Sequence, residues 1–149
     1  MADVLCLDAN VWIKALLRED PPELTLAART LLDRRDTRLV APGFAWAEVG
    51  SILRKKIRTR EITAAQAETH WRTFRRYPVE YLDFSLLQER AWRLAGEFDL
   101  LTLYDAAYLA CTELAPAEVA DMREFWTADA NLISDLGGSR PPYVHELTR

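Results

Sequence analysis

Four acidic residues in separate parts of the chain stand where an apolar segment gives way to a helix-like pattern. Asp8 follows the uncharged run "VLCL", and Asp129 ends the segment "EFWTAD". Asp105 begins the helical part of "LLTLYDAAYLACTEL", and Glu48 lies one turn into the pattern after "RLVAP". Functional crevices of open parallel sheets lie beyond the carboxyl ends of the strands. We therefore expect all four carboxylates at one sheet edge.

Each acid taken alone also has a purely structural explanation. Asp8, Asp105 and Asp129 could cap the helices that they precede, and the helix dipole favours an acid there. Glu48 is harder to explain in this way. Phe44 and Ile52, four positions away on either side, are apolar, and no Lys or Arg stands three or four positions from it. An ionised, half-buried and unpaired carboxylate is costly unless a cation is supplied from elsewhere.

Taken together, the four carboxylates predict a metal site. Crowded carboxylates repel one another unless a divalent ion neutralises them. A cluster without Cys or His ligands suits the hard ions Mg²⁺ and Mn²⁺. Such an ion activates water and stabilises the charge that develops on an attacked phosphodiester. Asn10 and Thr127 are placed to orient a water or a phosphate from behind the ligands.

The net charge of −4 conceals a basic segment. Residues 54–76 hold eight basic and two acidic side chains, whereas the rest of the chain holds 11 basic and 21 acidic ones. These basic side chains form either two solvated helix faces or a phosphate-binding patch, and charge alone does not separate the two. They are Arg54, Lys55, Lys56, Arg58, Arg60, Arg72, Arg75 and Arg76.

Composition excludes several other classes of protein. The chain has 149 residues, 50% hydrophobic and 28% charged, which is typical of one folded domain and not of a disordered chain. It has neither a 20-residue apolar run nor a signal-peptide pattern, so we expect a cytoplasmic protein. Cys6 and Cys111 lie among apolar residues and are expected to be reduced packing residues. The separation of His70 and His145 gives no zinc-ligand spacing.

Hydrophobic periodicity and turn residues predict strands that alternate with helices. This order predicts an α/β fold with a mostly parallel central sheet, covered by helices on both faces, in a single domain over residues 1–149. The helices expected over 44–58 and 63–76 form a charged hairpin, the second beginning with a capping box at "TAAQ". Strands are expected at 4–7, 37–42, 79–84, 124–129 and 143–147, with an extended start at 100–103; further helices are expected at 11–17, 24–34, 86–98 and from about 104.

Four segments in this order and spacing resemble the PIN domain, and more closely the VapC-type toxin ribonucleases of bacterial and archaeal toxin–antitoxin pairs. They are "LDANVWIKALL", "APGFAWAEVGSILRKKI", "LTLYDAAYLA" and "FWTADANL". The resemblance covers nearly the whole chain. It implies an α/β/α sandwich with four or five strands and a metal-dependent endoribonuclease that works as a homodimer. The family's acidic positions fall on Asp8, Glu48, Asp105 and Asp129, and its polar positions fall on Asn10 and Thr127.

Two details of this resemblance concern particular segments. The helical pair across residues 44–76 corresponds to the family's projecting clip, which is used in dimer formation and antitoxin contact. The link "APAEVADMRE" is longer than the resemblance predicts, which makes Asp129 the least securely placed acid. Asp121 and Glu124 are alternatives to it, and Asp99 is a further candidate.

The resulting hypothesis is an endoribonuclease that uses Mg²⁺ or Mn²⁺ to cut single-stranded or looped RNA, with an antitoxin as protein partner. Basic residues of the segment 54–76 would follow the phosphate backbone. One alternative is a catalytically silent PIN-like module that binds RNA or protein. A phosphatase of the aspartyl-phosphate type is disfavoured, because it needs an Asp where Asn10 stands. The five tryptophans are expected to pack rather than to stack on bases.

Overall fold

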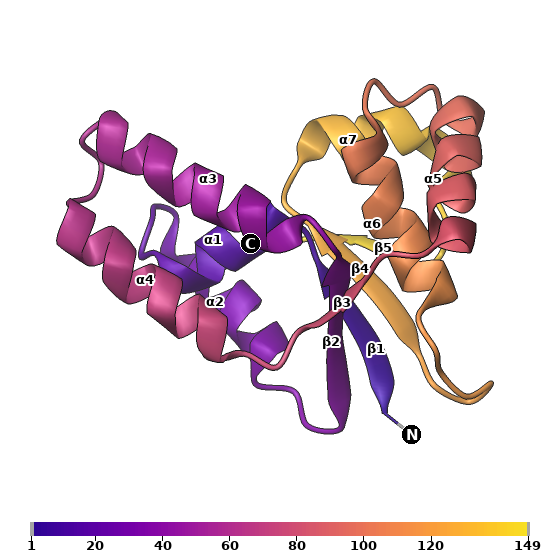
Figure 1. The fold of residues 1–149 in the computed structure, drawn as a ribbon, viewed down its shortest axis with the longest axis horizontal. Helices are drawn as coiled ribbons and strands as arrows, with labels where there is room; N and C mark the ends of the chain where they lie inside the picture. Colours follow the sequence, from indigo (N-terminus) through magenta and orange to yellow (C-terminus); the bar gives the residue numbers. More distant parts are fainter. Residues whose placement is uncertain (1, 149) are drawn as a thin grey trace.

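A computed structural model describes residues 2–148, which contain one five-stranded sheet with the strand order β3-β2-β1-β4-β5 (Figure 1). All four strand pairs are parallel, which confirms the predicted fold class. The chain builds outward from β1 to β3, then crosses back to place β4 on the other side of β1. Asp8 therefore follows the central strand, at the point where the strand order reverses. The strands are β1 (Asp3–Leu7), β2 (Thr37–Pro42), β3 (Glu80–Leu82), β4 (Arg123–Thr127) and β5 (Val144–Glu146).

Helices cover both faces of the sheet and enclose two separate apolar cores. Alternate residues of a strand point to opposite faces, so Val4 and Cys6 join one core while Leu5 and Leu7 join the other. Figure 1 shows the first four helices on one side and the last three on the other. The helices are α1 (Ala9–Leu16), α2 (Pro22–Leu32), α3 (Ala45–Arg58), α4 (Ala64–Arg76), α5 (Ser85–Glu97), α6 (Leu103–Leu114) and α7 (Ala130–Leu136), followed by the short 3-10 helix η1 (Gly137–Ser139).

The helices α3 and α4 form the predicted hairpin, and they extend away from the sheet (Figure 1). The capping box is present: Oγ1 of Thr63 accepts a 3.1 Å hydrogen bond from the Gln66 amide, and Oε1 of Gln66 accepts one of 2.8 Å from the Thr63 amide. A Cβ atom at Gly50 would lie 3.1 Å from Cζ3 of Trp71. The glycine thus allows Trp71 of α4 to pack closely on α3.

The extended start that the sequence predicted at 100–103 is wrong. Residues 100–102 connect α5 to α6, Leu103 begins α6, and the side chain of Leu101 is 97% exposed. Asp99 lies in the turn before this segment and has a left-handed backbone conformation, with a φ of +51°. An apolar run resembles a buried strand in sequence, but these leucines lie at the tip of an antiparallel helix pair. Among the helices of residues 2–148, none has the length and apolarity needed to cross a membrane.

Candidate active site

Asp8 lies at the carboxyl end of β1, where it is almost fully buried. Its amide donates a 3.0 Å hydrogen bond to the carbonyl of Trp126, which fixes the backbone to the neighbouring strand β4. Although Asp8 occupies the N-cap position of α1, its side chain makes no capping hydrogen bond to that helix, residues 9–16. Its Oδ2 instead accepts a 2.8 Å hydrogen bond from Oγ1 of Thr127. The simple cap explanation therefore does not account for this carboxylate.

Thr127 and Asn10 connect the start of α1 to the end of β4. The Thr127 side chain is fully buried, and its Oγ1 also accepts a 3.0 Å hydrogen bond from the Asp129 amide. Oδ1 of Asn10 accepts a 3.1 Å hydrogen bond from the Ala128 amide. The structure thus places Thr127 in direct contact with Asp8, and it places Asn10 on the backbone segment between Thr127 and Asp129.

Glu48 has a hydrogen-bond partner that the sequence analysis missed. Its Oε1 accepts a 2.8 Å hydrogen bond from the hydroxyl of Tyr108, a buried residue of α6. Tyr108 stands three positions after Asp105, which brings the two side chains onto neighbouring positions of one helix surface. A buried tyrosine needs a partner for its hydroxyl, so the spacing in "YDAAY" was the available signal.

The charges of the predicted acids act on one another. Burial is the main reason that the pKa of Asp8 rises to about 7; the Thr127 hydrogen bond opposes the rise, and the charges of Asp105 and Glu48 add to it. Burial also raises the pKa of Glu48, and the charge of Asp105 contributes. The pKa of Asp105 is raised first by burial and then by the charge of Asp129. Removing a proton from this sheet edge is therefore unfavourable without a compensating cation.

Asp129 both caps a helix and contributes charge to the site. Its Oδ1 accepts hydrogen bonds from the Asn131 amide at 2.9 Å and the Leu132 amide at 3.4 Å, so the capping explanation holds for this residue. Its charge nevertheless raises the pKa of Asp105. Asp135 of α7, an exposed residue that the sequence analysis did not consider, has the same effect.

The three alternative acids lie elsewhere. Oδ2 of Asp121 accepts a 2.8 Å hydrogen bond from the Glu118 amide in the link before β4. Glu124 stands near the amino end of β4, where it pairs with Arg34. Asp99 belongs to the turn between α5 and α6. Because Asp129 follows the carboxyl end of β4, the longer link does not change which acid reaches the site edge.

Within residues 2–148, no three His, Cys, Asp or Glu side chains are gathered closely enough to form a metal cage. The charges of Asp105 and Glu48 nevertheless raise the pKa of Asp8, and the charge of Asp105 raises that of Glu48. Their chemistry still fits a hard divalent ion, because all the donors are carboxylate oxygens. A bound cation would also offset the cost of ionising Asp8, the buried member of the set.

The basic side chains predicted to face phosphate lie on α3 and α4, and some are already paired. Nζ of Lys56 lies 2.9 Å from Oε2 of Glu19 and 3.3 Å from Oε1 of Glu61. Nε of Arg72 lies 3.0 Å from Oε1 of Glu68, and the Arg75 guanidinium lies 5.8 Å from the Trp71 ring centroid. Arg54, Lys55, Arg58 and Arg76 are exposed.

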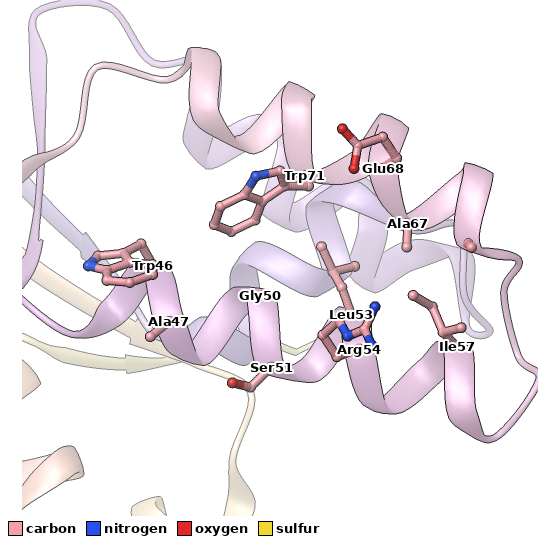
Figure 2. A pocket seen from close by; sticks show the side chains of 11 residues that line it. Trp46, Ala47, Gly50, Ser51, Leu53, Arg54, Ile57, Ala67, Glu68 and Trp71 are labelled. Carbon is pink, nitrogen blue, oxygen red and sulfur yellow. The ribbon is translucent and has the colours of Figure 1, made fainter.

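An apolar groove of about 510 Å³ runs between α3 and α4 (Figure 2). Its apolar lining includes Trp46, Leu53, Ile57, Ala67 and Trp71. The tryptophans, predicted to pack in the core or in a dimer instead of stacking on bases, differ in their surroundings. Trp12 is buried in the core and Trp126 stacks on His145, whereas Trp46 and Trp92 are exposed.

Comparison with known proteins agrees with this architecture. The PIN domain family model matches residues 5–134. The fold is similar to a chain in the crystal structure of VapBC2 from Rickettsia felis bound to a DNA fragment from their promoter, with a TM-score of 0.58 and 14% identity over 97% of this chain and 99% of that one. Among curated proteins, none matches this chain. Since the family model spans most of the chain, this protein belongs to the PIN domain family.

Proposed function

We propose that this chain is a metal-dependent endoribonuclease and the VapC-type toxin of a type II toxin–antitoxin pair, acting in the cytoplasm. One observation carries the catalytic part of the proposal. The buried Asp8 carboxylate, held by Thr127, shares the carboxyl edge of the sheet with the charges of Glu48 and Asp105. A carboxylate kept in this unfavourable environment serves no purpose in packing, but it suits a cation site.

The residues that would hold Mg²⁺ or Mn²⁺ are Asp8, Glu48, Asp105 and Asp129. When bound, the ion supplies an activated water and stabilises charge on the attacked phosphate. Thr127 holds the Asp8 carboxylate in one orientation through its 2.8 Å hydrogen bond. Tyr108 does the same for one oxygen of Glu48, leaving the other available. Asp129 uses one oxygen to cap α7 and can direct the other into the site.

The basic residues of α3 and α4 would bind the RNA backbone beside the acidic edge. Phosphate contacts of this kind attract RNA to a protein with a net charge of −4. The substrate would be single-stranded or looped, because an unpaired strand can bring one phosphate to a recessed site. The proposed contacts are Arg54, Lys55, Lys56, Arg58, Arg72, Arg75 and Arg76, of which Lys56 and Arg72 would exchange their present carboxylate partners for phosphate.

The proposed protein partners are a second copy of the chain and an antitoxin. The structural neighbour is a chain from a VapBC2 complex, which supports a partner of this kind. The groove between α3 and α4 offers the apolar surface, and Trp46 at one end of it is about half exposed (Figure 2). Size-exclusion chromatography with light scattering, repeated after Trp46→Ala, tests whether this surface is part of the dimer.

A second candidate function is a PIN-like module that binds RNA or protein without cleaving it. The absence of a gathered metal cage within residues 2–148 favours this alternative. The two functions differ in their response to Mn²⁺. A metal site should raise the melting temperature of the wild-type protein as Mn²⁺ is added, and it should do so far less in Asp8→Asn. Metal-dependent RNA cleavage that is lost in Asp8→Asn identifies the nuclease.

A further inference from the structure

Two rows of side chains connect the start of α3 with the start of α6. In the inner row, the Tyr108 hydroxyl donates to Oε1 of Glu48 at 2.8 Å. Four positions earlier in each segment, the rings of Phe44 and Tyr104 meet edge to face, with their centroids 5.1 Å apart and an interplanar angle of 81°. Phe44 also packs on Tyr108, with ring centroids 5.8 Å apart, so the outer aromatic pair adjoins the Glu48–Tyr108 contact.

Tyr104 is the exposed member of this pair. Its side chain is 57% exposed, although Phe44 holds its ring at one side. It immediately precedes Asp105, and the neighbouring Leu101 and Leu103 are also exposed. Trp46 is not part of this surface, because it lines the groove on the α4 side of α3 (Figure 2). An oriented aromatic ring thus projects into solvent beside the acidic edge.

We propose that Tyr104 stacks on a nucleobase adjacent to the phosphate that the carboxylates receive. This inference rests on the proposed function and assigns it a substrate-positioning residue. The basic residues of α3 and α4 would attract the backbone of any RNA, but backbone contacts alone do not select which nucleotide lies at the carboxylates. A neutral aromatic ring beside them holds one base by stacking, and unpaired RNA bases are commonly bound in this way. Stacking on Tyr104 would hold one nucleotide while its neighbouring phosphate faces Asp8, Glu48 and Asp105.

Steady-state cleavage of a short single-stranded RNA in Mn²⁺ gives the first test. Tyr104→Ala should raise KM by about 5- to 10-fold with little change in kcat, the low end of what one stacked base contributes. Tyr104→Phe should keep the wild-type KM, because the ring remains. Trp92→Ala is the matched control, since Trp92 is an exposed aromatic residue of α5 outside the site. An unchanged KM in Tyr104→Ala overturns the inference.

An abasic substrate identifies the interaction as stacking. Removing the base beside the cleaved bond should weaken cleavage by the wild-type protein and leave Tyr104→Ala unaffected. A similar loss in both proteins would show that Tyr104 does not contact that base. Binding of the same RNAs to Asp8→Asn separates this inference from the proposed function, because it needs no cleavage. If Asp8→Asn binds the intact RNA more tightly than the abasic RNA, and the added Tyr104→Ala substitution removes this difference, stacking is supported even if the wild type cuts no RNA. If Asp8→Asn binds the two RNAs with equal affinity, the inference is contradicted.

Discussion

Thr127 donates a 2.8 Å hydrogen bond to Asp8, so the ends of two adjacent parallel strands hold a single carboxylate. Thr127 is fully buried, and the same oxygen accepts from the Asp129 amide. One hydroxyl therefore links two of the proposed metal ligands. The rigidity of the site comes from β1 and β4, which carry these residues at their ends.

Replacing Thr127 with Val should remove this link while keeping the shape of the side chain. The buried carboxylate then loses its side-chain donor, which costs about 1–3 kcal/mol of unfolding free energy. Because the hydrogen bond lowers the pKa of Asp8, its loss should also move the acidic limb of the pH–activity profile upward. Thr127→Ser keeps the hydroxyl and is the control. Urea unfolding measures the change in stability, and pH–rate profiles measure the shift of the acidic limb. Equal stability and equal pH profiles for Thr127→Val and Thr127→Ser would refute the role of this hydrogen bond.

The metal-free protein should lose stability as the pH rises from about 4 to about 7. Burial gives Asp8 a pKa of about 7 in the folded protein, whereas the ordinary pKa of an aspartate is 3.8. Across this interval the folded state binds more protons than the unfolded state, so the free energy of unfolding falls with increasing pH, by a few kcal/mol. The shifts of Glu48 and Asp105 act in the same direction.

Asp8→Asn should flatten this dependence, because the substituted side chain does not titrate. Urea unfolding in EDTA at about pH 5 and about pH 8 measures the difference for each protein. Added Mn²⁺ should restore wild-type stability at the higher pH, since metal and proton compete for the same carboxylate. A wild type and variant with identical slopes would show that Asp8 is not the group responsible.

Tyr108→Phe should reduce cleavage while retaining the fold. The ring packs against Phe44 and Phe125, each with centroids 5.8 Å away, and only the hydrogen bond to Glu48 is lost. We expect a stability cost of about 1 kcal/mol. Tyr143→Phe is a matched control, because the Tyr143 hydroxyl also donates to a glutamate, Glu113, away from the site. Equal activity in both variants would argue against a role for Tyr108 in orienting Glu48.

Removing exposed basic residues of α3 should weaken RNA binding for all sequences alike. Arg54→Ala and Lys55→Ala each remove one proposed phosphate contact, which lowers the slope of log K against log salt by about 1 or slightly less. The control is Arg93→Ala on α5, where Arg93 pairs with Glu89 at 3.2 Å. Fluorescence anisotropy on Asp8→Asn across a salt series gives the slopes, and an unchanged slope for the α3 variants would exclude these contacts.

The fold could be predicted from sequence because its signals are local. The run "VLCL" predicts a central buried strand, and the capping box at Thr63 fixes the start of α4. The connection at 100–102 could not be predicted in this way, since Leu101 is exposed between two helices although it stands in an apolar run. That one domain spans residues 1–149 remains a prediction.

The candidate site could be predicted only in part, because some of its contacts depend on tertiary packing. Asp8 and Thr127 lie at strand ends, whose positions follow from the parallel topology. The hydrogen bond between Glu48 and Tyr108 depends on how α3 and α6 approach each other, and the two residues are 60 positions apart in the sequence. Whether a carboxylate caps a helix also depends on its rotamer. Asp129 makes such a cap and Asp8 does not, although both stand at N-cap positions.

Asp8 is the residue on which metal-dependent cleavage of RNA is expected to depend most. The most direct test is cleavage of a labelled single-stranded RNA by purified wild type and Asp8→Asn, with Mn²⁺ or EDTA, after circular dichroism has shown that both are folded. We predict that the wild type cleaves the RNA with Mn²⁺ and not with EDTA. The cleavage rate of Asp8→Asn should be lower by at least about 100-fold, the size of loss seen when a group that stabilises charge in the transition state is removed. Folded Asp8→Asn that cleaves as fast as wild type, or cleavage that persists in EDTA, would contradict the account.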